Sequence, residues 1–244
     1  MHDFQPMPRS SDSSTAAVKT RKTRSVGRRP KAEGAQETAP VILDAAEKLF
    51  SFHGFHGVTV RAVADECGVD SALVHYYFGT KQELFDAVFS RRAALINQDR
   101  MDAMARYEEE FGPHMTVEGV AAAFLMPLLD RVRHSDPAWK NYFALIGLVN
   151  SSRGWGADTM TSHFDPVVKR FISLLQRVLP HASLDDLFYS YHFLTGALTL
   201  TLSDTARLDR LSEGRCSSSN MDELAPRMVE YAAAGFRAVC KPKV

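Results

Sequence analysis

Residues 58–84 read VTVRAVADECGVDSALVHYYFGTKQEL and contain three helix starts and two glycine stops. Thr59 is placed to cap a helix that runs to Gly68, and Asp70 is placed to cap the next one. A second glycine ends that helix, and Thr80 begins a third with a capping box. Two short helices around a tight turn predict a helix-turn-helix, a motif whose second helix enters the major groove of DNA.

The second of these helices, over residues 71–78, has two opposite faces. Its inward arc is expected to contain Val74, Tyr77 and Phe78, and its outward arc Ala72, His75 and Tyr76. The outward rings are placed to meet phosphates, sugars or thymine methyl groups, and the small residues at the helix start allow close approach to a groove floor. The alternative is that residues 59–78 form an ordinary helical hairpin in an all-α core.

Outward from this stretch, the pattern is helical throughout. Before it, Thr38 is placed to cap a helix with Pro40 in its first turn. After it, Asp165 is placed to cap a helix with Pro166 in first position, and Ser183 and Asp222 are placed to cap the last two. The expected helices cover residues 81–110, 116–134, 138–150, 165–179, 184–202 and 222–239. The sequence therefore predicts an all-α fold.

Three domains are expected. They are a disordered basic arm over residues 1–36, a three-helix helix-turn-helix DNA-binding domain over 37–90, and a helical ligand-binding and dimerisation domain over 91–244.

The net charge of the chain is zero, but the charge is unevenly distributed. Residues 1–35 carry eight Lys and Arg against three acids, whereas residues 36–89 carry three against eight. The arm is too poor in apolar residues to fold alone. It is either a solubilising tail or an arm that neutralises DNA phosphates beside the acidic helix-turn-helix domain. In the second case Arg28 and Arg29 are among the residues that contact DNA.

Other site classes find little support in the composition. The three cysteines match no zinc or disulfide spacing, so neither a metal nor a cofactor is expected. No apolar run is long enough for a membrane helix, and the chain starts with polar and basic residues. We therefore expect a soluble cytoplasmic protein with no membrane partner.

Over roughly residues 38–90 the chain resembles the tetracycline-repressor (TetR) family of transcriptional regulators. Within this range, the segment VTVRAVADECGVDSALVHYYFGTKQELFDAV follows the N-terminal signature of that family. The resemblance implies that the chain binds double-stranded operator DNA, usually to repress transcription. It also implies that the residues in contact with the DNA are Thr59, Arg61, Ser71, Ala72, Leu73, His75, Tyr76, Tyr77 and Lys81. His75 departs from the family pattern, which has a tyrosine there, and a neutral imidazole makes the phosphate bond less strongly.

The last two helices have more apolar surface than one neighbour can cover. This favours a homodimer that joins these helices in a four-helix bundle, and two ordinary core helices of a monomer are the alternative. A dimer would also hold two reading helices about 34 Å apart, which suits a near-palindromic operator.

A small-molecule effector in the large domain is expected to alter the distance between the two DNA-binding domains of the dimer. Pro127 predicts a kink beside a cavity. The candidate wall residues are Phe124, Met126, Trp139, Phe143, Trp155, His163 and His192, and ordinary core packing is the alternative for each. The C-terminal sequence resembles the PsrA-like branch of the family, some of whose members respond to fatty acids or acyl-CoA. That resemblance implies an apolar effector with a carboxylate, which Arg153, Arg170 or His192 could meet.

Two other classes of function stay open at this stage. An enzyme is disfavoured because no nucleophile elbow, dinucleotide turn, P-loop or zinc-protease helix is present, and because His53 and His56 have no third ligand nearby. A protein-interaction adaptor that has kept the fold and lost DNA binding is the other class. The net negative charge of residues 36–89 and the histidine at position 75 are consistent with it. Selective, salt-dependent DNA binding would exclude the adaptor.

Overall fold

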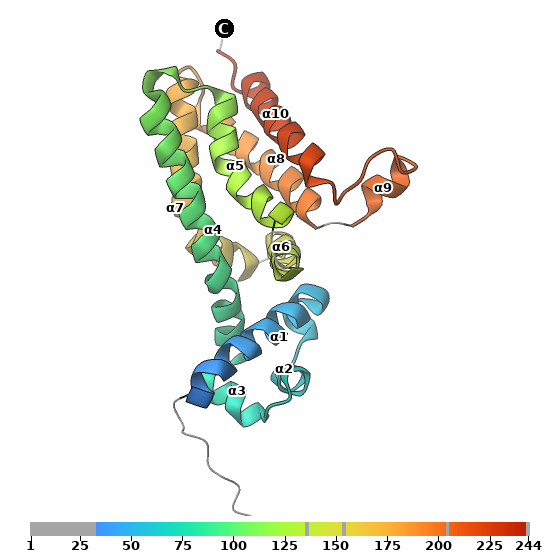
Figure 1. Ribbon diagram of the computed structural model, residues 1–244. Helices are drawn as coiled ribbons and strands as arrows, with labels where there is room; N and C mark the ends of the chain where they lie inside the picture. Colours follow the sequence, from blue (N-terminus) through green and yellow to red (C-terminus); the bar gives the residue numbers. More distant parts are fainter. Residues whose placement is uncertain (1–32, 135–136, 153–154, 204, 243–244) are drawn as a thin grey trace, which may run out of the picture.

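The computed structural model describes residues 33–134, 137–152, 155–203 and 205–242. Within these ranges every regular element is a helix, so the predicted all-α fold is confirmed (Figure 1). The first three helices form a small head, and a long helix joins this head to a larger helical body. None of the helices in these ranges is long and apolar enough to cross a membrane.

The head consists of α1 (Glu33–Gly57), α2 (Val60–Cys67) and α3 (Ser71–Phe78). α1 begins before Thr38, so the predicted cap at that residue is wrong. Gly54 kinks the helix with a φ of 67°, a left-handed value that glycine adopts without strain. The buried rings of Phe50 and Phe85 meet edge to face with centroids 5.2 Å apart and close the core of the head.

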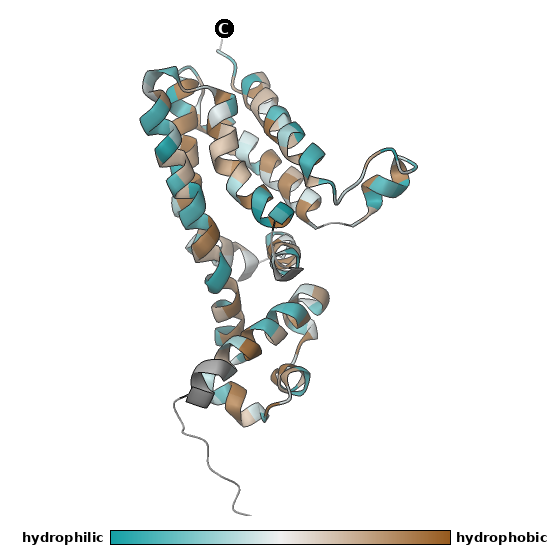
Figure 2. Ribbon diagram, in the orientation of Figure 1, coloured by the Kyte–Doolittle hydropathy of each residue, from teal (hydrophilic) through white to brown (hydrophobic). Residues whose placement is uncertain are grey.

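α4 (Lys81–Phe111) passes from the head into the body. Its predicted capping box is confirmed, because Thr80 Oγ1 accepts from the Glu83 N–H at 3.2 Å and the Glu83 carboxylate accepts from the Thr80 N–H at 2.7 Å. Buried side chains recur every three or four positions from Leu84 to Met104. Figure 2 shows that the lower part of α4, next to the head, is richer in hydrophobic residues than its upper part.

The body contains η1 (Gly112–His114), α5 (Val117–His134), α6 (Pro137–Asn150), α7 (Trp155–Val178), α8 (Leu184–Leu202), α9 (Arg207–Leu211) and α10 (Met221–Val239). α5 packs between α4 and α10, and α7 runs beside α4. α6 connects the two parts, because it packs against α1 of the head and against α8 of the body. The short α9 projects from the bundle between α8 and α10 (Figure 1).

Two predicted helix starts in the body are wrong. α7 begins at Trp155 instead of Asp165, and Pro166 lies inside it, because the buried stripe of α7 already includes Thr159 and Phe164. α10 begins at Met221, one residue before the predicted cap at Asp222, and no side chain caps it. The cap at Ser183 is confirmed: its Oγ accepts from the Asp186 N–H at 3.1 Å.

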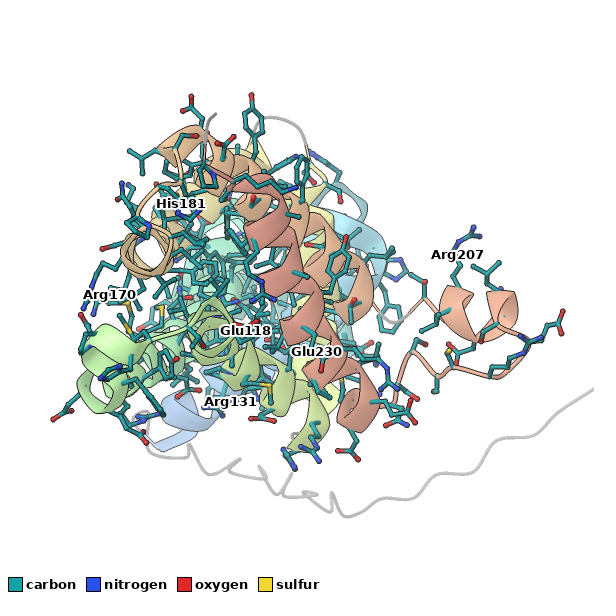
Figure 3. The ribbon with its side chains drawn as sticks, turned by 90° about the horizontal axis from the view of Figure 1, so that it is seen from above. Glu118, Arg131, Arg170, His181, Arg207 and Glu230 are labelled. Atoms are coloured by element: carbon teal, nitrogen blue, oxygen red, sulfur yellow. The ribbon has the colours of Figure 1, made fainter. Side chains whose placement is uncertain are left out.

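Charged residues cover the outer faces of the helices, and α9 carries Arg207 away from the bundle (Figure 3). Glu118 of α5 pairs with Arg237 of α10, and Glu108 of α4 pairs with Arg170 of α7. Arg170 was a candidate partner for an effector carboxylate, and it already has an acid. Part-exposed pairs of this kind add little stability, so the buried apolar faces hold the bundle together.

Candidate functional site

Two side-chain caps and one glycine fix the turn between α2 and α3. Thr59 Oγ1 accepts from the Ala62 N–H at 3.1 Å, and Asp70 Oδ1 accepts from the Ala72 N–H at 2.8 Å. Between them Gly68 has a left-handed φ of 69° and bonds back to the last turn of α2. These contacts confirm the predicted starts of both helices, and they set the direction in which α3 leaves the turn.

The two faces of α3 differ sharply in exposure. Val74 is 1% exposed, and Tyr77 and Phe78 are half-buried, so the predicted inward arc is confirmed. Tyr76 is 79% exposed, and His75 is exposed beside it. The Tyr76 ring meets the Tyr77 ring edge to face at 5.4 Å, which orients it on the outer face.

His75 has one ring nitrogen committed to its own helix end. Its Nδ1 lies 2.6 Å from the carbonyl oxygen of Gly79. Because a carbonyl only accepts, Nδ1 carries the proton in this contact. Nε2 then becomes a donor only when the ring holds two protons, so His75 can bond a phosphate through Nε2 only as an imidazolium.

The predicted DNA contacts at the other helix starts differ in how free they are. Arg61 is exposed, with its nearest carboxylate, Asp65, at 3.9 Å. Lys81 donates from Nζ to the Val58 carbonyl at 2.8 Å and lies over the Phe55 ring at 4.3 Å. The Lys81 charge is therefore partly used to close the head.

The first turn of α3 exposes Ala72 and half-buries Ser71 and Leu73. The remaining two predicted contacts, Arg28 and Arg29, lie outside the described residues.

A charge cluster around one buried glutamate joins α1 of the head to α4. Glu47 of α1 is 1% exposed and accepts from Arg91 Nη2 at 2.9 Å and from Arg92 Nε at 2.7 Å. Arg91 also donates to Asp44 at 2.8 Å, and the Arg92 guanidinium lies 5.0 Å from the Trp139 ring. We call these residues the α1–α4 clamp: Asp44, Glu47, Arg91 and Arg92.

The clamp changes the interpretation of the acidic head. The prediction counted Asp44 and Glu47 as part of a negative domain over residues 36–89. Their partners Arg91 and Arg92 lie two and three residues after the end of that window. The head is therefore less negative than its own residues indicate, because α4 neutralises part of its charge.

A small cavity of about 40 Å³ lies between α4, α5, α6, α7 and α8. Its walls are mainly apolar, with Phe124 and Phe164 among the rings and Met160 and Leu198 among the aliphatic side chains. Polar atoms come from Tyr191, Asn150, Thr195 and Thr199, and the one charged wall residue in the described chain is Arg100.

Two family models match this chain. Residues 42–88 match the model of bacterial regulatory proteins of the tetR family, and residues 122–235 match the tetracyclin repressor-like C-terminal domain. The first match lies on the head and the start of α4, and the second spans most of the body. The chain belongs to the TetR family.

Curated transcriptional regulators are similar to parts of this chain. The HTH-type transcriptional regulator UidR of Escherichia coli (strain K12) is 33% identical over 75 residues, which are 31% of this chain and 35% of UidR. The HTH-type transcriptional regulator SrpR of Pseudomonas putida is 29% identical over 157 residues, which are 63% of this chain and 65% of SrpR. The chain thus spans about a third of the length of UidR and about two thirds of SrpR.

The fold is shared with solved TetR-family structures. The crystal structure of HlyIIR, a hemolysin II transcriptional regulator, matches with a TM-score of 0.57 and 16% identity, over 85% of this chain and 99% of HlyIIR. At this identity the likeness shows the fold alone.

The structure brings few of the predicted effector residues of this TetR-family chain together. Phe124 lines the small cavity, whereas Met126 lines a broad groove of about 760 Å³ on the outer side of α4 and α5. Trp139 and Phe143 are buried and pack against Tyr142.

The remaining candidates lie in three different places. His163 sits between α7 and α4, with Nε2 3.4 Å from Ser90 Oγ, and burial lowers its pKa although Asp86 raises it. His192 is exposed on α8. The side chain of Trp155 and all of Arg153 lie outside the described residues.

Sequence reasoning missed Glu47, Arg91, Arg92 and Arg100. A signal for Arg100 was present, because Ala93, Ile96, Arg100 and Met104 recur at three- and four-residue spacing along α4. An arginine in an apolar stripe predicts a buried cation. The clamp residues gave no comparable signal, because their pairing depends on how α1 crosses α4.

Proposed function

We propose that this TetR-family chain is a DNA-binding transcriptional regulator of the repressor type, which reads a near-palindromic operator as a homodimer. The observation that carries the proposal is the outer face of α3. Tyr76 is 79% exposed there, while Val74 on the opposite side is 1% exposed. A short capped helix with exposed rings on its outer face fits a major groove.

Exposed apolar side chains on α8 and α10 support the homodimer. They are Leu184, Phe188, Tyr189, Phe193 and Leu200 on α8 and Tyr231 and Val239 on α10. Between the two helices lies a hollow of about 200 Å³, lined by Phe193, Tyr231 and Gly235 among others. A second copy related by a two-fold axis would bury this surface in a four-helix bundle.

The effector site of this proposal is the small cavity around Phe124. The cavity touches α4, the helix that also starts at the head, so an effector that enlarges the cavity would move α4 and change the spacing of the two heads. Apolar walls support an apolar effector, and the resemblance to the PsrA-like branch supports a fatty acid or acyl-CoA. A differential affinity of about 2.7 kcal/mol between free and operator-bound states would change operator occupancy a hundredfold.

Fluorescence anisotropy tests the DNA-binding face. The probe is a labelled fragment from upstream of the gene for this chain, with unrelated DNA as competitor. The double variant Ser71→Glu/Tyr76→Ala is expected to bind at least about tenfold more weakly, because a charge-assisted and an aromatic contact are both removed. An acidic residue is well tolerated in the first turn of a helix, so α3 should stay folded.

Phe111→Ala is the matched control, since Phe111 is an exposed aromatic at the far end of α4. It should bind the fragment as the wild-type chain does. Equal operator affinity of the double variant and the wild type, both as folded dimers, would contradict the proposal.

The arm contributes through its charge in this proposal. Removing residues 1–32 leaves α1 intact and deletes eight Lys and Arg. We expect weaker binding and a flatter salt dependence, because each phosphate contact adds about −0.9 to the slope of log K against log salt. The same slope in the truncated chain would show that the arm is only a tail.

A further inference from the structure

Arg100 is a cation inside the body. It lies on α4, is 3% exposed, and forms part of the wall of the small cavity. Its Nε donates to the Phe124 carbonyl at 2.9 Å, and its guanidinium lies 4.0 Å from the centroid of the Phe124 ring. That ring is held in turn by Phe171, which stacks on it with centroids 4.0 Å apart and planes at 12°. The guanidinium is therefore rigidly positioned.

No acid balances this charge in the part of the chain that the structure describes. Arg100 takes part in none of the ion pairs there, and its Nη2 is buried without a hydrogen-bond partner. Burial lowers the pKa of Arg100 to about 10, while Tyr191 and Tyr142 act to raise it, so the guanidinium stays charged at neutral pH. Buried charges are normally paired, and among the described residues the contacts of this one are with a carbonyl and a ring.

Two other arginines close to α4 show the usual arrangement. Arg92 lies against the Trp139 ring and is paired with Glu47, and Arg131 lies against the same ring and is paired with Asp99 at 2.6 Å. Arg100 has the aromatic contact and lacks the carboxylate. The missing partner is what an acidic ligand would supply.

We propose that Arg100 is the anchor for the carboxylate of an effector whose apolar body occupies the cavity beside Phe124. This inference rests on the proposed function and names the chemical class of the effector. A carboxylate fits the planar, forked donors of a guanidinium, and Nη2 is the donor still free to bind it.

The walls restrict the effector to a single negative charge. Arg100 is the only charged residue among the described wall residues, so a phosphate or a coenzyme A moiety would leave charge unpaired inside the cavity. The rest of the ligand meets Phe164, Met160 and Leu198, which suit an alkyl or aryl body. Free fatty acids and aryl carboxylic acids meet both conditions.

The cavity must open to admit such a molecule. Its volume of about 40 Å³ holds only water-sized groups, whereas ligand pockets usually measure about 300–1,000 Å³. Met160 is a flexible wall residue that can repack, and it lies near the start of α7. Binding therefore has to displace at least one of the five helices that line the cavity.

Isothermal titration calorimetry on the full chain tests the anchor. The probes are octanoate and 2-naphthoate, each compared with its own primary amide, which has nearly the same shape and no charge. The wild-type chain is expected to bind at least one acid about ten- to a hundredfold more tightly than its amide, as a charged hydrogen bond predicts.

Arg100→Met removes the charge and keeps the length of the side chain, and it should abolish this preference. Arg100→Lys keeps a point charge without the fork and should retain a weaker preference for the acid. Arg106→Met is the control, because Arg106 is an exposed arginine on the same helix and should leave the preference unchanged.

Two results would overturn the anchor. One is that the wild-type chain binds neither acid better than its amide. The other is that Arg100→Met, folded by circular dichroism, keeps the full preference for the acid. DNA binding is measured separately on the wild-type chain, so that failure of the regulator and failure of the carboxylate site are read from different experiments.

Discussion

Glu47 on α1 of the head and Arg100 on α4 are both almost completely buried charges, and their surroundings are opposite in kind. Glu47 has two arginines within 3 Å, and Arg100 has no acid within the described chain. The clamp around Glu47 fixes α1 against α4. The guanidinium of Arg100 leaves a donor unused beside a cavity.

The difference separates a structural charge from a binding charge. A buried carboxylate between two guanidinium groups satisfies its desolvation locally, so its removal leaves cations without a partner. A buried cation without an acid is destabilising in the free protein and becomes favourable only when an anion arrives. The same substitution at the two sites should therefore have opposite effects on stability.

Glu47→Met should show the largest effect. It keeps the side-chain volume and removes the acid that Arg91 and Arg92 share, so we expect the free energy of unfolding to fall by about 3 kcal/mol. Urea denaturation followed by circular dichroism measures this change. Glu66→Met removes an acid from the exposed pair with Lys48 and should change stability by less than about 1 kcal/mol. A loss at Glu47 no larger than that at Glu66 would remove the contrast between the two sites.

Arg100→Met should have a smaller effect of opposite sign. Loss of an unpaired buried cation is expected to raise the free energy of unfolding by about 1–2 kcal/mol, reduced by the lost contacts with Phe124. The same urea titration measures it in the absence of any ligand. A decrease of several kcal/mol would mean that the Phe124 contacts already compensate the charge.

His163, which contacts Ser90 of α4, should give the smallest effect. Burial lowers its pKa in the folded chain, so below the ordinary histidine pKa of about 6.5 the unfolded chain binds the proton more readily. Stability is therefore fully present above that pH and falls as the pH decreases towards the folded pKa. His163→Gln should lose less stability than the wild type between pH 7.5 and pH 5.5. Parallel losses in the two chains would show that His163 does not contribute.

The part of the fold that sequence predicted best depends on short-range contacts. Four helices are capped through hydrogen bonds that span only two or three residues, from Thr59, Asp70, Thr80 and Ser183. Because these contacts are local, the residue types alone predict where the helices start. Pro166 misled the same reasoning, because a proline that usually opens a helix lies inside α7.

Long-range pairing could not be predicted in the same way. The charge count of the head stopped just before Arg91 and Arg92, which lie 44 and 45 residues from Glu47. The lack of an acid near Arg100 depends on how five helices pack, and no local pattern records it. For this reason the predicted effector residues scattered, and the one charged wall residue was missed.

The 31 residues of α4 include neither glycine nor proline. The segment from Lys81 to Arg100, roughly 28 Å long at 1.5 Å per residue, thus contains no residue that favours bending. A displacement at one end reaches the other as a shift or tilt of the whole rod. The head and the cavity therefore keep a fixed rotation relative to each other about the axis of α4. A single residue inserted between Arg92 and Arg100 would rotate one relative to the other by about 100°.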